Sequence, residues 1–179
     1  VEHDEAPGKG KPDKIPQLRP AFAKDGTITA ATSSSISDGA AAVVLSRESV
    51  AKGNGQEPVA KIVALAAHAQ EPSEFTVAPV GAIEKVLKSA GWSADEVDLW
   101  EVNEAFACVA MFAMRDIGIP HDKINVNGGG TALGHPIGAS GTRIIVTLLN
   151  ALKQQGKKRG IASLCIGGGE ATAVAVEMV

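Results

Sequence analysis

Apolar residues recur with helical spacing in three stretches of the second half of the chain. They are Val80, Ile83, Val86, Leu87 and Ala90 in the first stretch, Phe106, Val109, Ala110, Ala113 and Met114 in the second, and Ile144, Ile145, Leu148, Leu149 and Leu152 in the third. Residues three and four apart share one face of a helix, so each stretch predicts an amphipathic helix, the second over Asn103–Ile117. A glycine follows each stretch, at Gly91, Gly118 and Gly156, where a left-handed residue commonly ends a helix.

Shorter apolar runs between these stretches predict β-strands. The runs are Ala40–Leu45, Val59–Ala67, Val97–Val102, Ile124–Asn127, Ile161–Ile166 and Ala171–Met178. A short helix is expected over Ser46–Gly53, whereas the Lys-, Pro- and Gly-rich residues before about Gly26 predict an extended surface segment. Because strands alternate with helices, we predict a layered α/β fold with a mostly parallel sheet and packed helices. Only the last two strands are close enough for a hairpin, which gives one antiparallel edge strand.

The composition of the 179 residues is that of an ordinary globular domain, with 45% hydrophobic and 21% charged residues. A net charge of -3 gives no basic excess for nucleic-acid binding, and no apolar run is long enough to span a membrane. With no signal peptide and only two cysteines, a cytoplasmic protein is expected. The chain begins with Val1 rather than Met, which suggests that upstream coding sequence is missing.

Three loops follow predicted strands and carry residues that can do chemistry. They are Asn103–Phe106, Gly134–Gly141 and Cys165–Gly169, with the sequences Asn-Glu-Ala-Phe, Gly-His-Pro-Ile-Gly-Ala-Ser-Gly and Cys-Ile-Gly-Gly-Gly. Functional loops of α/β sheets lie beyond the carboxyl ends of strands, so these side chains are expected to converge at one end of the sheet.

The residue types in these loops fit acid–base chemistry, although each also has a simpler structural interpretation. Cys165 can act as an acid or base if its surroundings lower its pKa, with glycine N–H groups beside it to hold an oxyanion, or it can be a small buried residue. His135 lies in a loop, which fits a general base. Asn103 can hold a water molecule or cap the helix that follows it. Cys108, inside that helix, is expected to pack, and His68 is expected at the surface.

Other ligands are poorly supported by the sequence. Gly134–Gly141 has the wrong spacing for the glycine-rich dinucleotide motif and lacks the Gly-Lys-Ser/Thr ending of a phosphate-binding loop. His135 and Cys165 supply two possible zinc ligands where three or four are usual, so no metal is expected.

Five segments, in order along the chain, resemble the thiolase family. Besides the three loops they are Ser37–Leu45 and Asn127–Gly130, and the likeness runs from about Leu18 to the C-terminus. The resemblance implies acyl transfer between coenzyme A thioesters in fatty acid metabolism, either joining two acetyl-CoA molecules into acetoacetyl-CoA or cleaving a 3-ketoacyl-CoA, with no further cofactor. Related condensing enzymes that use carrier-protein substrates pair their cysteine with two histidines. Cys165 takes the place of the second histidine here, which favours a thiolase.

The resemblance also implies roles for individual residues. His135 would activate a cysteine nucleophile and, with a water molecule held by Asn103, form one oxyanion hole. Cys165 would move the α-proton of acetyl-CoA, and the N–H of Gly167 would contribute to a second oxyanion hole. The residues implied to contact the substrate are Ser34, Phe75 and Phe106.

The same resemblance divides the chain and leaves it incomplete. Residues 1–55 would be the tail of a thiolase N-terminal domain, and residues 56–179 the C-terminal domain. The nucleophilic cysteine belongs to the N-terminal half, and neither Cys108 nor Cys165 lies in a matching context, so the chain alone is expected to be inactive. Its partners would be the missing half, acyl-CoA and CoA, and further copies in a dimer or tetramer, with no nucleic acid and no membrane.

Two other hypotheses remain open at this point. The first is an acyl-CoA-binding relative that has lost catalysis, which the intact Asn103, His135 and Cys165 disfavour. The second is a natural separate subunit that completes an N-terminal partner, whereas the non-Met start favours truncation or proteolysis near residues 8 to 14. The sequence of the 179 residues indicates neither which acyl-chain length is preferred nor whether the enzyme works in synthesis or in degradation.

Overall fold

The computed structural model describes residues 2–3 and 8–179, and its centre is one four-stranded sheet. The strands are β1 (Ala60–Ala69), β2 (Leu99–Val102), β3 (Arg159–Cys165) and β4 (Glu170–Met178), in the spatial order β1-β4-β3-β2. β2 and β3 are parallel, whereas β4 runs antiparallel to both β1 and β3. The layered α/β fold is therefore confirmed, with three strands in one direction and one against them.

The position of the antiparallel strand differs from the expectation. We predicted it at an edge, but β4 lies inside the sheet between β1 and β3. The hairpin from Cys165 to Glu170 places β4 directly beside β3, with the N–H of Ile166 donating to the carbonyl of Glu170 (2.7 Å). β1 then pairs with the free side of β4, from Ala60 opposite Met178 to Ala69 opposite Glu170. Two of the three strand pairings are consequently antiparallel.

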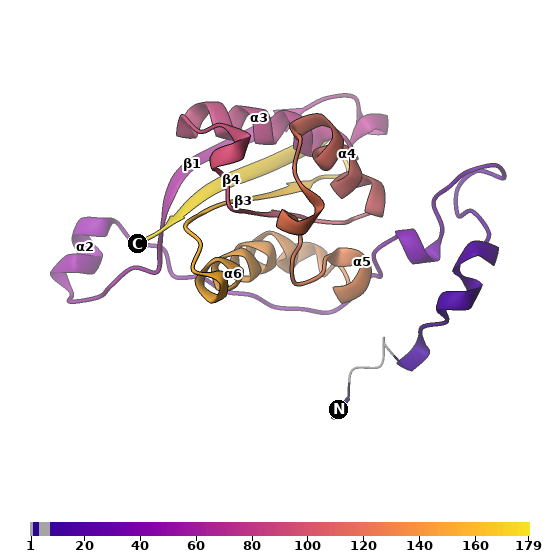
Figure 1. Cartoon of the computed structure of the whole chain (residues 1–179), viewed down its shortest axis with the longest axis horizontal. Coiled ribbons are helices and arrows are strands. Elements are labelled where there is room, and N and C mark those ends of the chain that lie inside the picture. Colours follow the sequence, from indigo (N-terminus) through magenta and orange to yellow (C-terminus); the bar gives the residue numbers. More distant parts are fainter. Residues whose placement is uncertain (1, 4–7) are drawn as a thin grey trace.

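Helices cover both faces of this sheet (Figure 1). The helices are α2 (Glu48–Gly53), α3 (Ala78–Ala90), α4 (Ala107–Ile117), α5 (Gly130–Leu133) and α6 (Ile137–Gln155). Short 3-10 turns span Pro12–Gln17, Ala30–Thr32, Pro72–Glu74, Ala94–Glu96 and His121–Lys123. α3 packs on β1, β3 and β4 and against α4, and α6 packs on β2, β3 and β4 from the other side. Among the described residues no helix is both long and apolar enough to cross a bilayer.

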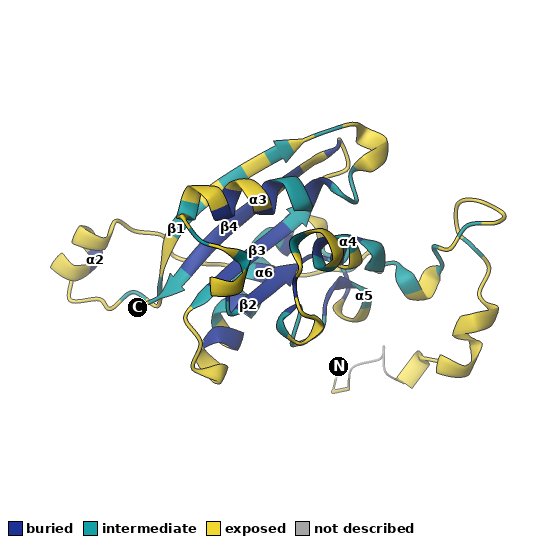
Figure 2. Ribbon diagram, turned by 45° about the horizontal axis from the view of Figure 1, so that its top comes forward, coloured by how far each residue is buried: buried dark blue, intermediate teal, exposed yellow. Residues whose placement is uncertain are grey.

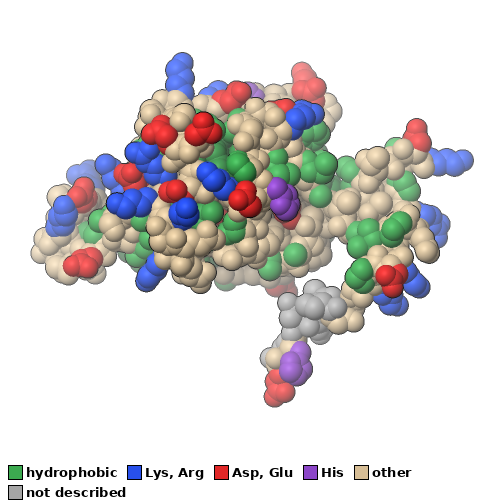
Figure 3. Space-filling view, in the orientation of Figure 1, with side chains coloured by type: hydrophobic (Ala, Val, Ile, Leu, Met, Phe, Trp, Pro, Cys, Tyr) green, Lys and Arg blue, Asp and Glu red, His purple; other side chains and the backbone are tan. Residues whose placement is uncertain are grey.

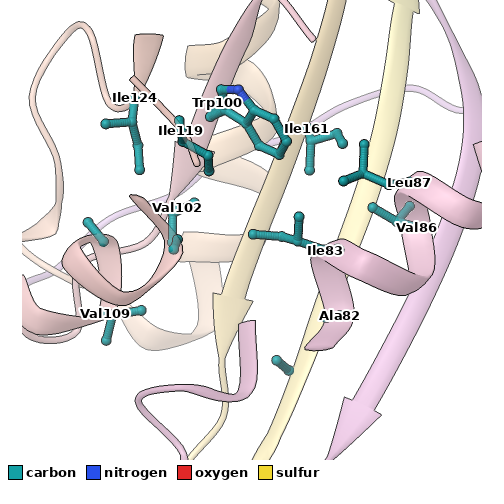
Figure 4. Close-up of a cluster of buried hydrophobic side chains, with 14 of the residues drawn as sticks. Ala82, Ile83, Val86, Leu87, Trp100, Val102, Val109, Ile119, Ile124 and Ile161 are labelled. Atoms are coloured by element: carbon teal, nitrogen blue, oxygen red, sulfur yellow. The ribbon is translucent and has the colours of Figure 1, made fainter. Parts of the chain in front are cut away.

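The two faces of the sheet bury separate apolar clusters, because successive residues of a strand point to opposite sides. Trp100, Ile161 and Ile83 belong to the cluster beneath α3 and α4 (Figure 4). The neighbouring residues Leu99 and Ala162 belong to the cluster beneath α6. The predicted helix ends are confirmed: the three glycines that follow α3, α4 and α6 are left-handed, with φ of 69°, 80° and 62°.

Most of the chain before β1 is exposed and forms no strand of this sheet (Figure 2). The predicted strand Ala40–Leu45 is not formed: its residues are irregular and exposed, with only Ala41 partly covered. An apolar run becomes a strand only beside another strand, and no strand of the described sheet pairs with it. Ile124–Asn127 is likewise no strand, since Ile124 makes only an isolated bridge to Trp100.

Candidate active site

The chemically active loops meet at the carboxyl ends of the two parallel strands. β2 ends at Val102 opposite Ser163, and the N–H of Asn103 donates to the carbonyl of Ser163 (2.9 Å). Cys165 ends β3 two residues further on. The parallel register therefore puts Asn103 and Cys165 at the same edge of the sheet, as expected from their positions directly after two predicted strands.

His135 joins this edge from the loop before α6. Its Nε2 lies 3.4 Å from Nδ2 of Asn103, and its Nδ1 lies 2.6 Å from Oγ of Ser140. Ser140 is buried and donates its only hydroxyl hydrogen to the carbonyl of Pro136 (3.0 Å), so its oxygen accepts from the imidazole. The proton of the neutral ring is thus on Nδ1, and the lone pair on Nε2 faces the amide of Asn103. This is the tautomer that a general base at Nε2 requires.

Burial and charge keep His135 neutral. Its side chain is partly buried, and the resulting desolvation, reinforced by the nearby cation of Arg143, lowers the pKa of the imidazole below its usual value. At neutral pH the ring is unprotonated and able to accept a proton.

Asn103 does not cap α4, which removes the structural alternative for this residue. The helix begins at Ala107 instead of Asn103, its N-cap is Phe106, and no side chain satisfies the cap. Asn103 is 1% exposed, and its Oδ1 accepts from Nη2 of Arg143 (3.5 Å) while its Nδ2 faces His135. The amide is therefore held on both sides within the site.

Cys165 is buried, and burial raises the pKa of its thiol to about 11. A thiol that acts as a base needs a lowered pKa, whereas the surroundings of Cys165 in this chain raise it. The thiol is therefore protonated at neutral pH and can act as an acid. The turn that follows is open: Gly167 is exposed, and among the described residues its N–H has no hydrogen-bond acceptor. A free N–H next to a protonated thiol can donate to an incoming oxygen atom.

The three residues expected to contact a substrate come together beside the Asn103–Phe106 loop. The N–H and hydroxyl of Ser34 both donate to the carbonyl of Ala105 (3.1 and 3.0 Å). The ring of Phe106 packs edge-on against Phe75 (6.2 Å between centroids) and against Phe22 (5.7 Å). Phe22 was not predicted in this group, because nothing in its lysine- and proline-rich surroundings distinguishes it.

The chain before β1 also reaches His135. The N–H of His135 donates to the carbonyl of Ser35 (2.9 Å), and Ile36 forms a parallel bridge with the same residue. A side chain at Gly134 would collide with the hydroxyl of Ser37, so this glycine, with φ of 89°, allows the close approach of the two segments. The two predicted parts of the chain therefore share one site.

A second polar network holds the loop that precedes His135. Glu104 accepts hydrogen bonds from the N–H and hydroxyl of Thr131 and from Nδ2 of Asn125 (2.9 Å). Asn125 also bonds the N–H and carbonyl of Val102 (both 2.9 Å) and is itself left-handed, with φ of 48°. Sequence reasoning missed both residues, because Asn125 lies inside the predicted strand Ile124–Asn127 and no local signal marks its left-handed turn.

Glu101 and Arg143 are the other missed residues. They form a buried ion pair between β2 and α6, with Nη1 of Arg143 3.4 Å from Oε2 of Glu101. The available signal was a lone carboxylate in the Leu-Trp-Glu-Val strand, since a charge in a fully buried strand needs a partner. Within residues 2–3 and 8–179, no three His, Cys, Asp or Glu side chains gather as metal ligands.

Two family models together match nearly the whole chain. Residues 56–178 match the model of the thiolase C-terminal domain, and residues 1–49 match that of the thiolase N-terminal domain. The chain is 50% identical over 177 residues to a probable acetyl-CoA acetyltransferase of Dictyostelium discoideum, covering 99% of this chain and 43% of that protein. It is 48% identical over 179 residues to an acetyl-CoA acetyltransferase of Yarrowia lipolytica, covering all of this chain and 45% of that protein.

Solved structures give the same result. The acetyl-CoA acetyltransferase of Bacillus anthracis superposes with a TM-score of 0.91 at 42% identity, over 93% of this chain and 42% of that one. The Acat5 thiolase of Ascaris suum, solved in complex with coenzyme A, gives 0.90 at 38% identity, over 100% of this chain and 47% of that one. The chain spans less than half the length of these relatives. Fold, motifs and relatives agree, and the chain belongs to the thiolase family.

Proposed function

We propose that this chain is the C-terminal half of a thiolase and contributes two proton-transfer groups to acyl transfer between CoA thioesters. The reaction joins two acetyl-CoA molecules into acetoacetyl-CoA and CoA, or runs in reverse as thiolysis of a 3-ketoacyl-CoA. The observation that carries the proposal is the pair of groups at one sheet edge: the Nε2 lone pair of His135, held beside Asn103, and the protonated thiol of Cys165. A base and an acid at one edge suit a two-step transfer through an acyl-enzyme intermediate.

In the cleavage direction the roles are as follows. His135 takes the proton of a cysteine nucleophile supplied by the missing half, and the thiolate attacks the 3-keto carbon. The bond between C2 and C3 then breaks, the acyl group stays on that cysteine, and the thiol of Cys165 protonates the departing carbanion to give acetyl-CoA. The thiol of a second CoA finally takes up the acyl group and releases the cysteine.

Two sets of donors would stabilise the oxyanions of these steps. A water molecule held by Nδ2 of Asn103 acts at the thioester carbonyl together with His135, whose Nε2 can donate once it has taken the proton of the nucleophile, and the free N–H of Gly167 acts beside Cys165. No further cofactor is required by this chemistry. Ser34, Phe75 and Phe106 line the approach to the site, and CoA complexes of the Ascaris suum thiolase and of human mitochondrial 3-ketoacyl-CoA thiolase support CoA thioesters as the ligands.

The proposal makes this chain dependent on a partner segment. Residues 1–55 form the tail of the N-terminal domain and residues 56–179 the C-terminal domain, so the nucleophile comes from a preceding half of the same protein. The whole protein is a homo-oligomer, a dimer or tetramer. It works in the cytoplasm, as does the relative from Gibberella zeae, an acetyl-CoA acetyltransferase named as cytosolic.

The test is a chimera in which this chain replaces the matching C-terminal part of the Bacillus anthracis acetyl-CoA acetyltransferase. Thiolysis of acetoacetyl-CoA is measured for the chimera and for this chain alone. We expect turnover by the chimera and none by the chain. Cys165→Ser and His135→Ala should each lower kcat about 100-fold or more, the usual contribution of a general acid or base.

The control variant is Cys108→Ser, which changes the other thiol of the chain, on α4, and keeps the thiol of Cys165. It should keep the activity of the parent chimera. An inactive but folded chimera that still binds acetoacetyl-CoA would replace this proposal with the acyl-CoA-binding hypothesis. Equal losses in the two cysteine variants would withdraw the assignment of Cys165.

A further inference from the structure

Asn103 has a polar side chain, and the orientation of its amide decides what it offers to His135. The NH₂ end can only donate and the oxygen can only accept. Two hydrogen-bond networks are therefore possible. In the first, Nδ2 of Asn103 donates to Nε2 of His135, and Nδ1 of His135 donates to Ser140. In the second, the amide is reversed, the imidazole proton moves to Nε2 to meet the amide oxygen, and Ser140 turns to donate to Nδ1. Only the first leaves a basic lone pair on Nε2.

The neighbour on the far side of the amide distinguishes the two networks. Nη2 of Arg143 lies 3.5 Å from Oδ1 of Asn103. A guanidinium has five N–H donors and no acceptor, so it pairs with the amide oxygen and opposes the amide NH₂. Reversing the amide would place two donors against each other at a site where Asn103 is only 1% exposed, and a buried donor left without an acceptor is costly.

Arg143 is in turn fixed by a carboxylate. Glu101 on β2 precedes Asn103 by two residues, and the N–H of Asn103 continues the pairing with β3 just past the end of the strand, so both side chains point toward α6. Nη1 of Arg143 lies 3.4 Å from Oε2 of Glu101, and the side chains are 18% and 1% exposed. Within the described chain Oε1 of Glu101 and Nε of Arg143 have no hydrogen-bond partner. An incompletely satisfied buried ion pair is a weak source of stability, which favours a role other than holding the fold together.

We propose that Arg143, held by Glu101, is a positioning residue that orients the amide of Asn103 and so keeps the proton of His135 on Nδ1. Its contact with the reaction is indirect, through Asn103, and its relevance to catalysis rests on the proposed function. The effect of Arg143 on the tautomer of His135 is independent of the proposed function, because it follows from the geometry of this chain.

Charge adds a second consequence of the same residue. The groups around the imidazole are Arg143 on α6 and, beyond it, Glu101 on β2 and Glu104 in the following loop. After burial, the cation of Arg143 is the cause that lowers the pKa of His135. Removing the cation should raise the pKa of His135, whereas a lysine at this position keeps both the charge and a group that can only donate to Oδ1 of Asn103.

The test uses histidine labelled with ¹⁵N in the full 179-residue chain, in which long-range ¹H–¹⁵N spectra report both the tautomer and the pKa of each imidazole. The variants are Arg143→Met and Arg143→Lys. In the parent chain His135 should carry its proton on Nδ1. Arg143→Met should move a substantial share to Nε2 and raise the pKa, whereas Arg143→Lys, which keeps a cation that can only donate, should retain the parent tautomer and the low pKa.

Loss of the guanidinium leaves Glu101 buried without a partner, so Arg143→Met can fail to fold. The double variant Glu101→Gln/Arg143→Met removes both charges and keeps the test intact, with folding checked by circular dichroism. An imidazole that retains the parent tautomer and pKa in the folded double variant would overturn the proposal.

Kinetics in the chimera separate this inference from the proposed function. The double variant should lower kcat about 10- to 100-fold, the scale expected when a catalytic group is displaced slightly, with little change in KM for acetoacetyl-CoA. If the parent chimera is inactive, the proposed function fails while the spectra of His135 still decide the role of Arg143. A shifted tautomer with unchanged kcat would limit Arg143 to a structural effect on the imidazole and overturn its part in catalysis.

Discussion

Glu101 shows how one buried residue contributes to the pH dependence of stability. Desolvation outweighs the attraction of Arg143 and raises the pKa of this carboxyl from 4.5 to about 7. The folded chain therefore holds a proton that the unfolded chain releases between these two values, and stability falls as the pH rises through this window. At about 1.4 kcal/mol per unit, the loss attributable to Glu101 is about 3 kcal/mol and is complete above its folded pKa.

Replacing Glu101 by Gln should remove this dependence. Urea unfolding at several pH values between 4.5 and 8 should show the stability of the parent chain, relative to Glu101→Gln, decreasing by about 3 kcal/mol across the window. Glu84→Gln, at an exposed position of α3, is the matched control for replacing a glutamate by glutamine. A difference for Glu101→Gln that stays constant across the window would mean that burial does not perturb this carboxyl.

The catalytic candidates and their supports differ in what the sequence reveals. Asn103 and Cys165 stand in short motifs after strands that form, so their common edge could be inferred, whereas the strand predicted before the motif of His135 is not formed and only the motif itself pointed to this residue. Arg143 could not be inferred, because it contacts Glu101 and Asn103, residues about 40 positions away, only after α6 has packed on β2. The raised pKa of Cys165 was also unpredictable, since it comes from burial that only the folded sheet creates.

At the scale of elements, the helices were easier to predict than the strands. α3 and α6 have a complete apolar face and a left-handed glycine at the end, signals that are local in sequence. Ala40–Leu45 has only apolar composition, and whether such a run becomes a strand depends on a neighbour that the sequence does not specify. The same reason explains β4: the hairpin was predicted, but its second neighbour, β1, arrives from more than a hundred residues away.

Two glycines in helices test how closely these elements pack. A Cβ at Gly81 of α3 would lie 2.7 Å from the ring of His68 on β1, a residue that we expected at the surface but that is partly buried here. A Cβ at Gly141 of α6 would meet no atom within 4 Å. Alanine is favoured over glycine in helices by about 1 kcal/mol, so Gly141→Ala should raise the urea midpoint. Gly81→Ala should lower it, because overpacking costs about 1–3 kcal/mol.

The double-mutant cycle identifies the cause. In a His68→Ala background the obstacle is gone, and Gly81→Ala should become stabilising, like Gly141→Ala. A Gly81→Ala variant that destabilises the chain equally in both backgrounds would point to the backbone of α3 instead of the ring of His68.

At the scale of the molecule, apolar side chains are unevenly distributed between the core and the surface. The sheet is packed against α3, α4 and α6, yet exposed apolar residues collect on β1 and on the segment before it. Green side chains are visible on the N-terminal segment at the right of Figure 3. Leu65 on β1 is 69% exposed and Val44 is 98% exposed. β1 also pairs on one side only, so its other edge presents unpaired backbone groups. Such a surface is typical of a protein that is covered by another chain or segment.

We therefore expect the isolated chain to self-associate through β1. Sedimentation velocity at micromolar concentrations should show dimers or larger species that dissociate on dilution. Leu65→Lys places a charge at an exposed position of this edge strand, so it should shift the chain toward monomer while its circular dichroism spectrum stays unchanged. Val50→Lys makes the same substitution on α2, which projects away from the sheet in Figure 1, and should leave association as in the parent chain. A parent chain that remains monomeric at high concentration would show that the unpaired edge of β1 is protected without a partner. If both lysine variants shifted the chain equally toward monomer, general repulsion between charged chains would explain the shift. The contact between chains would then not be at β1.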